Sequence, residues 1–140
     1  MSIVSNKEAM NRFVEFINTA SEGMANEVIS QDAIFHVPGN PEPMRGPEGY
    51  LQIVGMMRSG FSDIQWSLED IVAEGDTVAA RLLMTGTHNG NFMGVPPTGK
   101  SIKVQAMNFY FFSNGKIVKE YGQPDFMGLM IQIGAIPPPG

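Results

Sequence analysis

Asp125 is the side chain whose sequence surroundings point most directly to chemistry. Its neighbours include Tyr121, Phe126 and Met127, all aromatic or apolar. Burial among such side chains would strip water from the carboxyl group, raise its pKa toward neutrality and make it usable as a proton donor or acceptor. Asp is also among the preferred helix N-cap residues, so a structural role at the start of a helix over 126–132 is the alternative.

The two histidines are the next candidates for proton transfer. His36 stands between Phe35 and Val37 in a short β-like segment, and its ordinary pKa of about 6.5 would let it change charge in the physiological range. A hydrogen-bonded structural histidine at a strand end is the alternative. His88 lies in a loop rich in Gly and Asn, where we expect it to organise the turn.

Metal and phosphate sites are not predicted. His36, His88 and Asp125 lack the spacing of a pair of metal ligands. The segment from Gly94 to Lys100 matches no P-loop, and no strand-to-helix context follows it. The chain contains no cysteine, so it has neither a disulfide nor a thiolate metal site.

Several further side chains are candidates to line a pocket. Tyr and Trp offer an apolar body with a polar tip, while amide, hydroxyl and imidazole groups can stabilise an oxygen that gains negative charge. Core packing is the alternative for the aromatic members. The candidates for substrate binding are Asn108, Tyr110, Gln105, Tyr121, Tyr50, Trp66, Phe13 and His88. Arg81 is expected to pair with an acid on a neighbouring strand, for which Glu120 is one option.

The charge of the chain argues against polyanionic partners. Its 140 residues include nine Lys or Arg and 14 Asp or Glu, a formal net charge of −5, and the basic residues are scattered singly. Nucleic acid and membrane surfaces are therefore not expected as partners. The length fits one domain over residues 1–140. The amino terminus shows no signal-peptide pattern, and the apolar-rich run over 126–136 is too short to span a bilayer, so we expect a cytoplasmic protein.

The first half of the chain is predicted to be mainly helical. The S-x-x-E sequence at Ser5 has the form of a capping box, and a helix from there presents Met10, Phe13 and Ile17 on one face. A second helix is expected over 21–30, a short strand over 33–37, and a third helix from 47 to 60, with a loop before it over 38–46.

The second half is predicted to be β-structure. Strands are expected over 64–72, 77–87 and 101–113, with a loop over 90–100. Asn114-Gly115 is a strong signal for a tight hairpin, and the strand that follows runs up to Asp125. The order α-α-β-α-β-β-β-β predicts an α+β fold in which helices pack on one face of an antiparallel sheet.

The strand over 101–113 carries information about assembly. Met107 and Phe109 fall on one face, while Tyr110 and Phe112 fall on the other. In a sheet with one solvent-exposed face, the residues along each strand should alternate between apolar and polar. Because this strand is apolar on both sides, both faces of the sheet are expected to be covered. Helices cover one face, and a second copy of the chain would cover the other, which predicts a homodimer through the outer sheet face.

A series of short blocks along the chain carries a family resemblance. The longest is GTHNGNFMGVPPTGK at residues 86–100. The others are FH at 35–36, GPEG at 46–49, EGDTVAAR at 74–81, GKI at 115–117, EY at 120–121, Asp125, and QIGAIP at 132–137. In type and order these blocks resemble the SnoaL-like polyketide cyclase family, over about residues 6–137.

The resemblance implies a cone-shaped α+β barrel of the nuclear transport factor 2-like type. In this fold a curved antiparallel sheet wraps over three amino-terminal helices and encloses a deep apolar pocket. The resemblance also implies an intramolecular aldol condensation of a polyketide ester that needs neither metal nor cofactor, with an acidic general acid and base at the position matching Asp125. Two positions depart from the family pattern: Tyr121 stands where cyclases tend to have Trp, and no His occurs between residues 101 and 113.

Two functions are consistent with these features. The first is a cyclase-type enzyme acting on an apolar, carbonyl-containing small molecule, with Asp125 and His36 as catalytic residues; an isomerase or hydrolase using the same pocket is a variant. The second is a non-catalytic dimeric domain that binds a small apolar ligand or a partner protein. Exposure of Asp125 to a cavity would favour the first function, and backbone N–H groups satisfying Asp125 beside a filled cavity would favour the second.

Overall fold

The computed structural model describes residues 3–139, and its main elements follow the order expected from the sequence. The helices are α1 (Ile3–Thr19), α2 (Glu22–Val28), α3 (Gly46–Gly60) and α4 (Phe126–Gln132). The strands are β1 (Ile29–His36), β2 (Met44–Arg45), β3 (Gln65–Glu74), β4 (Thr77–Thr87), β5 (Ser101–Ser113) and β6 (Lys116–Pro124). The two-residue strand β2 was not expected. The predicted start of the first helix at Ser5 was wrong, because α1 is already helical at Ile3.

The six strands form one sheet in the order β2-β1-β6-β5-β4-β3. Strands β3 to β6 are antiparallel neighbours. Asn114 and Gly115 join β5 to β6, and both have positive φ (50° and 77°), as a type I′ hairpin turn requires. The pair β1 and β6 is parallel, which differs from the antiparallel expectation. These two strands lie far apart in the sequence, so no hairpin constrains their relative direction.

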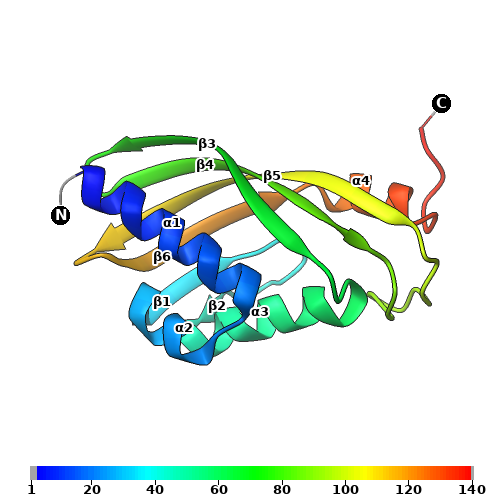
Figure 1. Cartoon of the computed structure of the whole chain (residues 1–140), viewed down its shortest axis with the longest axis horizontal. Coiled ribbons are helices and arrows are strands. Elements are labelled where there is room, and N and C mark those ends of the chain that lie inside the picture. Colours follow the sequence, from blue (N-terminus) through cyan, green and yellow to red (C-terminus); the bar gives the residue numbers. More distant parts are fainter. Residues whose placement is uncertain (1–2, 140) are drawn as a thin grey trace.

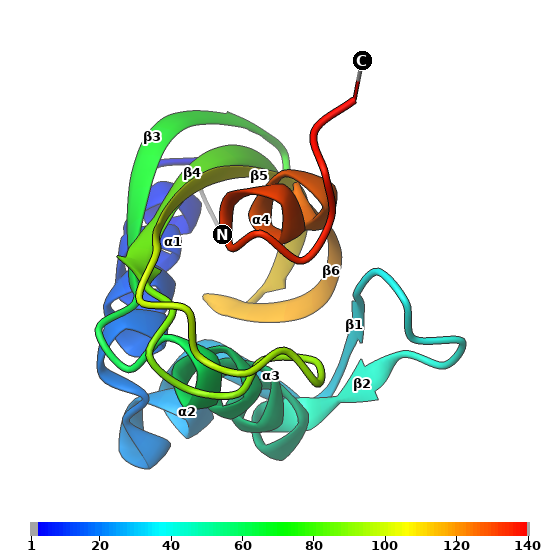
Figure 2. The same ribbon diagram turned by 90° about the vertical axis from the view of Figure 1, so that its right-hand side faces the viewer.

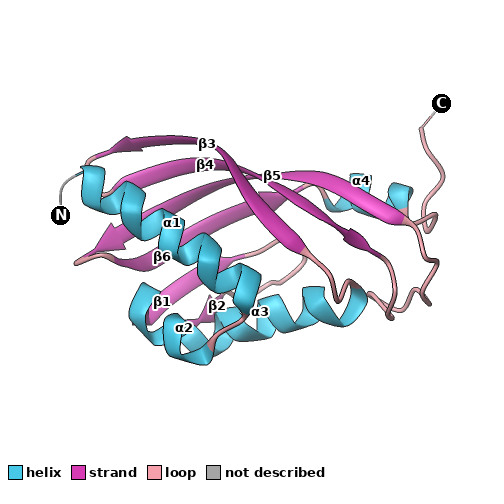
Figure 3. Ribbon diagram, in the orientation of Figure 1, coloured by secondary structure: helices cyan, strands magenta, loops and turns pink. Residues whose placement is uncertain are grey.

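The sheet is strongly curved, and helices α1 to α3 pack against its concave side (Figure 1, Figure 3). Figure 2 shows strands β3 to β6 bending around the interior, with α4 near the end of the sheet where the chain leaves it. The interior is filled by aromatic rings: Phe13 on α1 lies 5.0 Å from the Tyr50 ring on α3 and 5.4 Å from the Tyr110 ring on β5. The expected curved α+β fold is confirmed.

A β-bulge in β6 decides which of its side chains face the interior. Phe111 pairs with Lys119, but the next residue, Phe112, pairs with Ile117, so Val118 is an extra residue on β6. An extra residue shifts the alternation of side chains by one position. As a result Ile117 and Glu120 are both buried although they are three residues apart.

The opposite face of the sheet carries a row of apolar side chains, which we call the outer row: Val72, Ala79, Phe109 and Tyr121. These residues are direct cross-strand neighbours on β3, β4, β5 and β6. Phe109 is 54% exposed, and Met107 on the same strand is 59% exposed. The expected apolar character of both faces of β5 is therefore present. Within residues 3–139, no helix has the length and apolar content needed to cross a membrane.

Candidate active site

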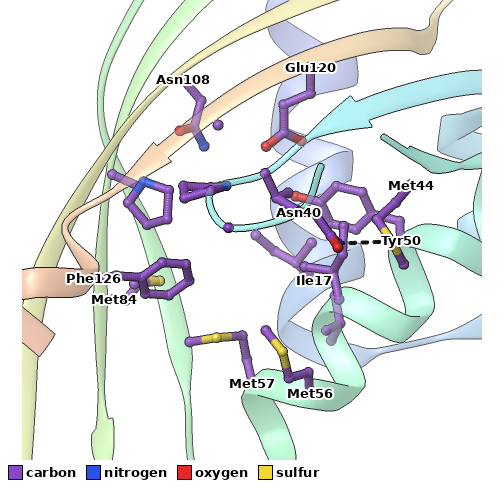
Figure 4. Close-up of a pocket in the computed structure, with 18 of the residues that line it drawn as sticks. Ile17, Asn40, Met44, Tyr50, Met56, Met57, Met84, Asn108, Glu120 and Phe126 are labelled. Carbon is purple, nitrogen blue, oxygen red and sulfur yellow. Dashed lines mark hydrogen bonds between the residues drawn. The ribbon is translucent and has the colours of Figure 1, made fainter. Parts of the chain in front are cut away.

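A cavity of about 290 Å³ lies between the concave face of the sheet and helix α3. Its walls are mainly apolar, and the lining residues within the described part of the chain include no Lys, Arg or His. Methionine is the most frequent side chain in the lining: Met44, Met56, Met57, Met84 and Met93. Thioether side chains are flexible and polarisable, so such walls adapt to the shape of an apolar ligand. Figure 4 shows Glu120 and Asn108 on the sheet side of this cavity, across from Met56 and Met57 on α3.

Among the described residues that line the cavity, Glu120 is the only acid, and it is 3% exposed. Removal from water penalises its charged form, and this desolvation raises its pKa to about 8, while a hydrogen bond from Tyr50 acts in the opposite direction. Oε1 of Glu120 is buried and has no hydrogen-bond partner among the described residues. Buried polar atoms are normally paired, so an unpaired carboxyl oxygen beside a cavity marks a position where a ligand can bind.

Tyr50 connects helix α3 to this acid. Its ring is packed edge-on against Phe35 at 4.7 Å, and its hydroxyl group acts on the Glu120 carboxyl group in the direction that lowers the pKa of Glu120. Burial, together with the nearby negative charge of Glu120, raises the pKa of Tyr50 well above its usual value. Tyr50 therefore stays protonated and remains a hydrogen-bond donor at all pH values at which the protein would work.

Asn108 provides the second polar group of the cavity. Its Oδ1 accepts a hydrogen bond from the backbone N–H of Gln123 at 2.9 Å, and its Nδ2 donates to the Tyr110 hydroxyl at 2.8 Å. These two contacts hold the amide in one orientation. An amide nitrogen carries two N–H donors, and Tyr110 takes one of them. The other is available to an oxygen atom of a ligand in the cavity.

The structure separates seven of the eight predicted substrate-binding residues into three groups, and the eighth, His88, lies at the start of the loop over 88–100. Asn108, Tyr50 and Trp66 line the cavity. Phe13 and Tyr110 are fully buried in the core behind it. Gln105 and Tyr121 are on the outer face, where Gln105 accepts a hydrogen bond from Arg81. Asn108 and Tyr50 are thus the predicted polar residues that the fold brings together around one acid.

Asp125 lies at the end of β6 with an exposed side chain. It is the N-cap of α4, and its Oδ1 accepts a hydrogen bond from the backbone N–H of Gly128 at 2.8 Å. Pro124 and Phe126 on either side of it line the cavity, but Asp125 does not. Its expected role as a proton carrier depended on burial of the carboxyl group, and the structure leaves the Asp125 side chain exposed.

The two histidines also lie outside the cavity. His36 ends β1, and its ring stacks on Tyr121 at 4.8 Å, on the outer face of the sheet. His88 is buried; its Nδ1 lies 2.9 Å from Oγ1 of Thr98 and accepts a hydrogen bond from the Thr98 backbone N–H at 3.2 Å. His88 thus holds the two ends of the loop over 88–100 together, as a residue that organises a turn would.

Arg81 was expected to pair with an acid on a neighbouring strand, and it pairs with Asp70 on β3 at 2.6 Å on the outer face. Glu120 was one option for this partner, but it lies on the opposite side of the sheet. The alternation of β6 predicts this only if the bulge at Val118 is known. Within residues 3–139, no group of three or more His, Cys, Asp or Glu side chains is arranged to hold a metal ion.

The polar groups of the cavity suit proton transfer at a carbonyl compound. A carboxyl group with a pKa of about 8 is present in both protonated and ionised forms around neutral pH, so it can give a proton to an oxygen and take one from a carbon. The free N–H of Asn108 can stabilise an oxygen that becomes negatively charged. The mainly apolar walls lower the local dielectric constant, which strengthens both interactions.

Comparison with known proteins gives consistent matches along the chain. The family model of SnoaL-like polyketide cyclase matches residues 7–133. The aklanonic acid methyl ester cyclase DauD of Streptomyces sp. (strain C5) is 32% identical over 134 residues, covering 91% of this chain and 80% of the relative. The nogalonic acid methyl ester cyclase of Streptomyces nogalater is 30% identical over 128 residues, covering 86% and 91%. The crystal structure of wild-type IdmH from Streptomyces antibioticus superposes with a TM-score of 0.83 at 31% identity, covering 92% and 98%.

Proposed function

Because the chain belongs to the SnoaL-like polyketide cyclase family, we propose that it is a cofactor-independent cyclase in which Glu120 is the general acid and base. The observation that carries this assignment is the position of Glu120. It is the only acid in the lining of an apolar cavity, it is buried, and one of its oxygens has no partner among the described residues. Its raised pKa supports the same role.

The proposed reaction is an intramolecular aldol condensation. The ionised Glu120 carboxylate removes a proton from the carbon next to a carbonyl group, and the electron pair of the broken C–H bond forms an enolate. The N–H of Asn108 donates a hydrogen bond to the enolate oxygen. The nucleophilic carbon then attacks a second carbonyl carbon of the same molecule and closes the ring, and the protonated Glu120 gives its proton to the new alkoxide. The carboxylate is regenerated, so no proton is gained or lost overall.

The charge distribution of the cavity favours an uncharged substrate with its reacting groups at one end. Within residues 3–139, no cationic side chain lines the cavity to neutralise a free carboxylate, whereas an ester or ketone needs no counter-ion. The methionine walls take the apolar body, and the polar end faces Glu120 and Asn108. The relatives named above are cyclases of aklanonic acid methyl ester and nogalonic acid methyl ester, which supports a methyl ester substrate here.

The assignment is tested by replacing Glu120 with Gln, which keeps the shape of the side chain and removes its ability to exchange a proton. Aklanonic and nogalonic acid methyl esters serve as probes, with ring closure followed by chromatography. We expect kcat to fall by about 10²- to 10⁴-fold, the usual contribution of general acid–base catalysis. Full activity of the Gln variant would contradict the assignment. Binding of the esters without ring closure by the unmodified protein would favour a ligand-binding domain, and a different product would favour an isomerase or hydrolase.

We also propose that the protein is a homodimer through the outer row. The row places apolar side chains side by side across four strands, and Phe109 and Tyr121 expose large apolar areas. An apolar patch of this kind on a sheet face is typical of a surface that another protein covers. A second copy of the same face matches it in character, and the aromatic side chains are of the type enriched in such interfaces.

A further inference from the structure

Gly122 has an unusual position relative to the proposed catalytic acid. It lies on β6 two residues after Glu120, it is buried, and it lines the cavity. A Cβ atom built on Gly122 would lie 2.8 Å from Oε2 of Glu120 and 3.7 Å from Oδ1 of Asn108. A separation under 3.0 Å is one that real Cβ atoms essentially never show. A side chain at this position therefore requires the flexible end of the Glu120 side chain to move.

The backbone itself does not require glycine here. Gly122 is not among the glycines with positive φ, so an alanine could adopt the same conformation without strain. Gly122 also pairs directly with Asn108 on β5, which places it between the two polar groups of the cavity. The feature that distinguishes glycine at this site is the space it leaves for the carboxyl group.

We propose that Gly122 is a positioning residue, whose missing side chain lets the Glu120 carboxyl group lie along the strand next to Asn108. This inference rests on the role proposed for Glu120. With a methyl group at position 122, the carboxyl group must rotate away, either toward Tyr50 or into the space where a ligand binds. Displacement of a catalytic group by about 1 Å can lower the rate about 100-fold, so the glycine would act on the rate through Glu120.

The test is the substitution Gly122→Ala, assayed with the same two methyl esters. We expect kcat to fall by about 10- to 100-fold while KM changes less, because the methionine side chains that take the apolar body of the substrate are unchanged. The pH at which activity changes should also move, since the carboxyl group enters a different environment. Gly55→Ala is the matched control: Gly55 lies on α3, and a Cβ there has open space around it. It should leave kcat, KM and the pH profile unchanged.

A rescue experiment separates positioning from general damage to the fold. Glu120→Asp shortens the acid by one methylene group and withdraws it from the added methyl group. In the Gly122→Ala background, Glu120→Asp should therefore cost much less activity than it does alone, or restore part of it. If the loss of activity in the double variant equals the product of the losses in the two single variants, the two residues act independently, because independent sites are additive in free energy. That result would overturn the proposal.

Failure of this inference can be told apart from failure of the proposed function. If Glu120→Gln abolishes ring closure while Gly122→Ala keeps the kcat and pH profile of the unmodified protein, Gly122 does not position the acid and the role of Glu120 stands. If Glu120→Gln is fully active, the proposed function fails. In that case the contact between Gly122 and Glu120 is still tested by 13C NMR of the labelled Glu120 carboxyl group in protein without substrate. If the pKa of Glu120 measured in this way is the same in Gly122→Ala as in the unmodified protein, the two residues are not in contact and the inference is overturned.

Discussion

Tyr50 on α3 and Glu120 on β6 both line the cavity, so that a helix and the concave sheet face meet at its acid. The Tyr50 hydroxyl favours the charged form of Glu120 and partly offsets the effect of burial on its pKa. Tyr50→Phe removes the hydroxyl and keeps the ring. We expect the pKa of Glu120 to rise further above about 8 and the alkaline rise of kcat to move to higher pH. If the pH–rate profile of Tyr50→Phe is the same as that of the unmodified protein, Tyr50 does not affect the pKa of Glu120.

Burial of Glu120 should make the protein less stable as the pH rises. The folded protein keeps the proton up to a pKa of about 8, whereas the unfolded chain loses it near the ordinary value of 4.5. Between these values the unfolded state binds fewer protons, so the free energy of unfolding falls with increasing pH, by about 1.4 kcal/mol per pH unit for one group.

Glu120→Gln should abolish this dependence, since glutamine does not titrate. Urea unfolding of both proteins at pH 5, 6, 7 and 8 checks the prediction. The free energy of unfolding of the Gln variant relative to the unmodified protein should increase steadily over this range. Two parallel curves would show that Glu120 does not hold its proton in the folded state.

Asp125 should matter for stability and not for catalysis. Asn is as good an N-cap as Asp, so Asp125→Asn should keep both the hydrogen bond from Gly128 and the activity. Asp125→Ala removes the cap and should lower the free energy of unfolding by about 1 kcal/mol, with kcat little changed. Thermal melting and the ring-closure assay on both variants check this. Loss of activity in the Asn variant at unchanged stability would return the catalytic role to Asp125.

The outer row should hold two copies of the chain together. Phe109→Asp places a charge in the middle of the row, and charges are expensive to bury at an interface. We expect the unmodified protein to sediment as a dimer and the variant as a monomer in analytical ultracentrifugation. Met127→Asp is the control, because Met127 is 61% exposed on α4 and lies outside the row. A monomeric unmodified protein would contradict the proposal.

Much of the fold was predictable because it depends on local signals. The hairpin at Asn114-Gly115 follows from two residues that tolerate positive φ. The apolar face of α1 with Met10 and Phe13 follows from a helical period, and both residues are buried. The parallel pairing of β1 with β6 carries no such signal, since it depends on how two distant segments meet after the helices have packed.

The site was only partly predictable, for the same reason. Asn108, Tyr50 and Trp66 were expected to line a pocket, and they do. Glu120 was considered only as one option for the partner of Arg81, and the bulge at Val118, which turns it toward the cavity, has no signal in the sequence. Asp125 stood out because its sequence neighbours are apolar, but apolar neighbours in the sequence do not by themselves bury a side chain at the end of a strand.

The sequence by itself determined the fold class, the turns and the apolar character of both faces of β5, because each is set by residue types at short spacing. The tertiary structure alone decided which acid enters the cavity. One extra residue in β6 turns Glu120 inward, the packing of α3 against the sheet removes it from water, and the absence of a side chain at Gly122 leaves room for its carboxyl group. Desolvation depends on everything that surrounds a group in space, and no local pattern in the sequence records it.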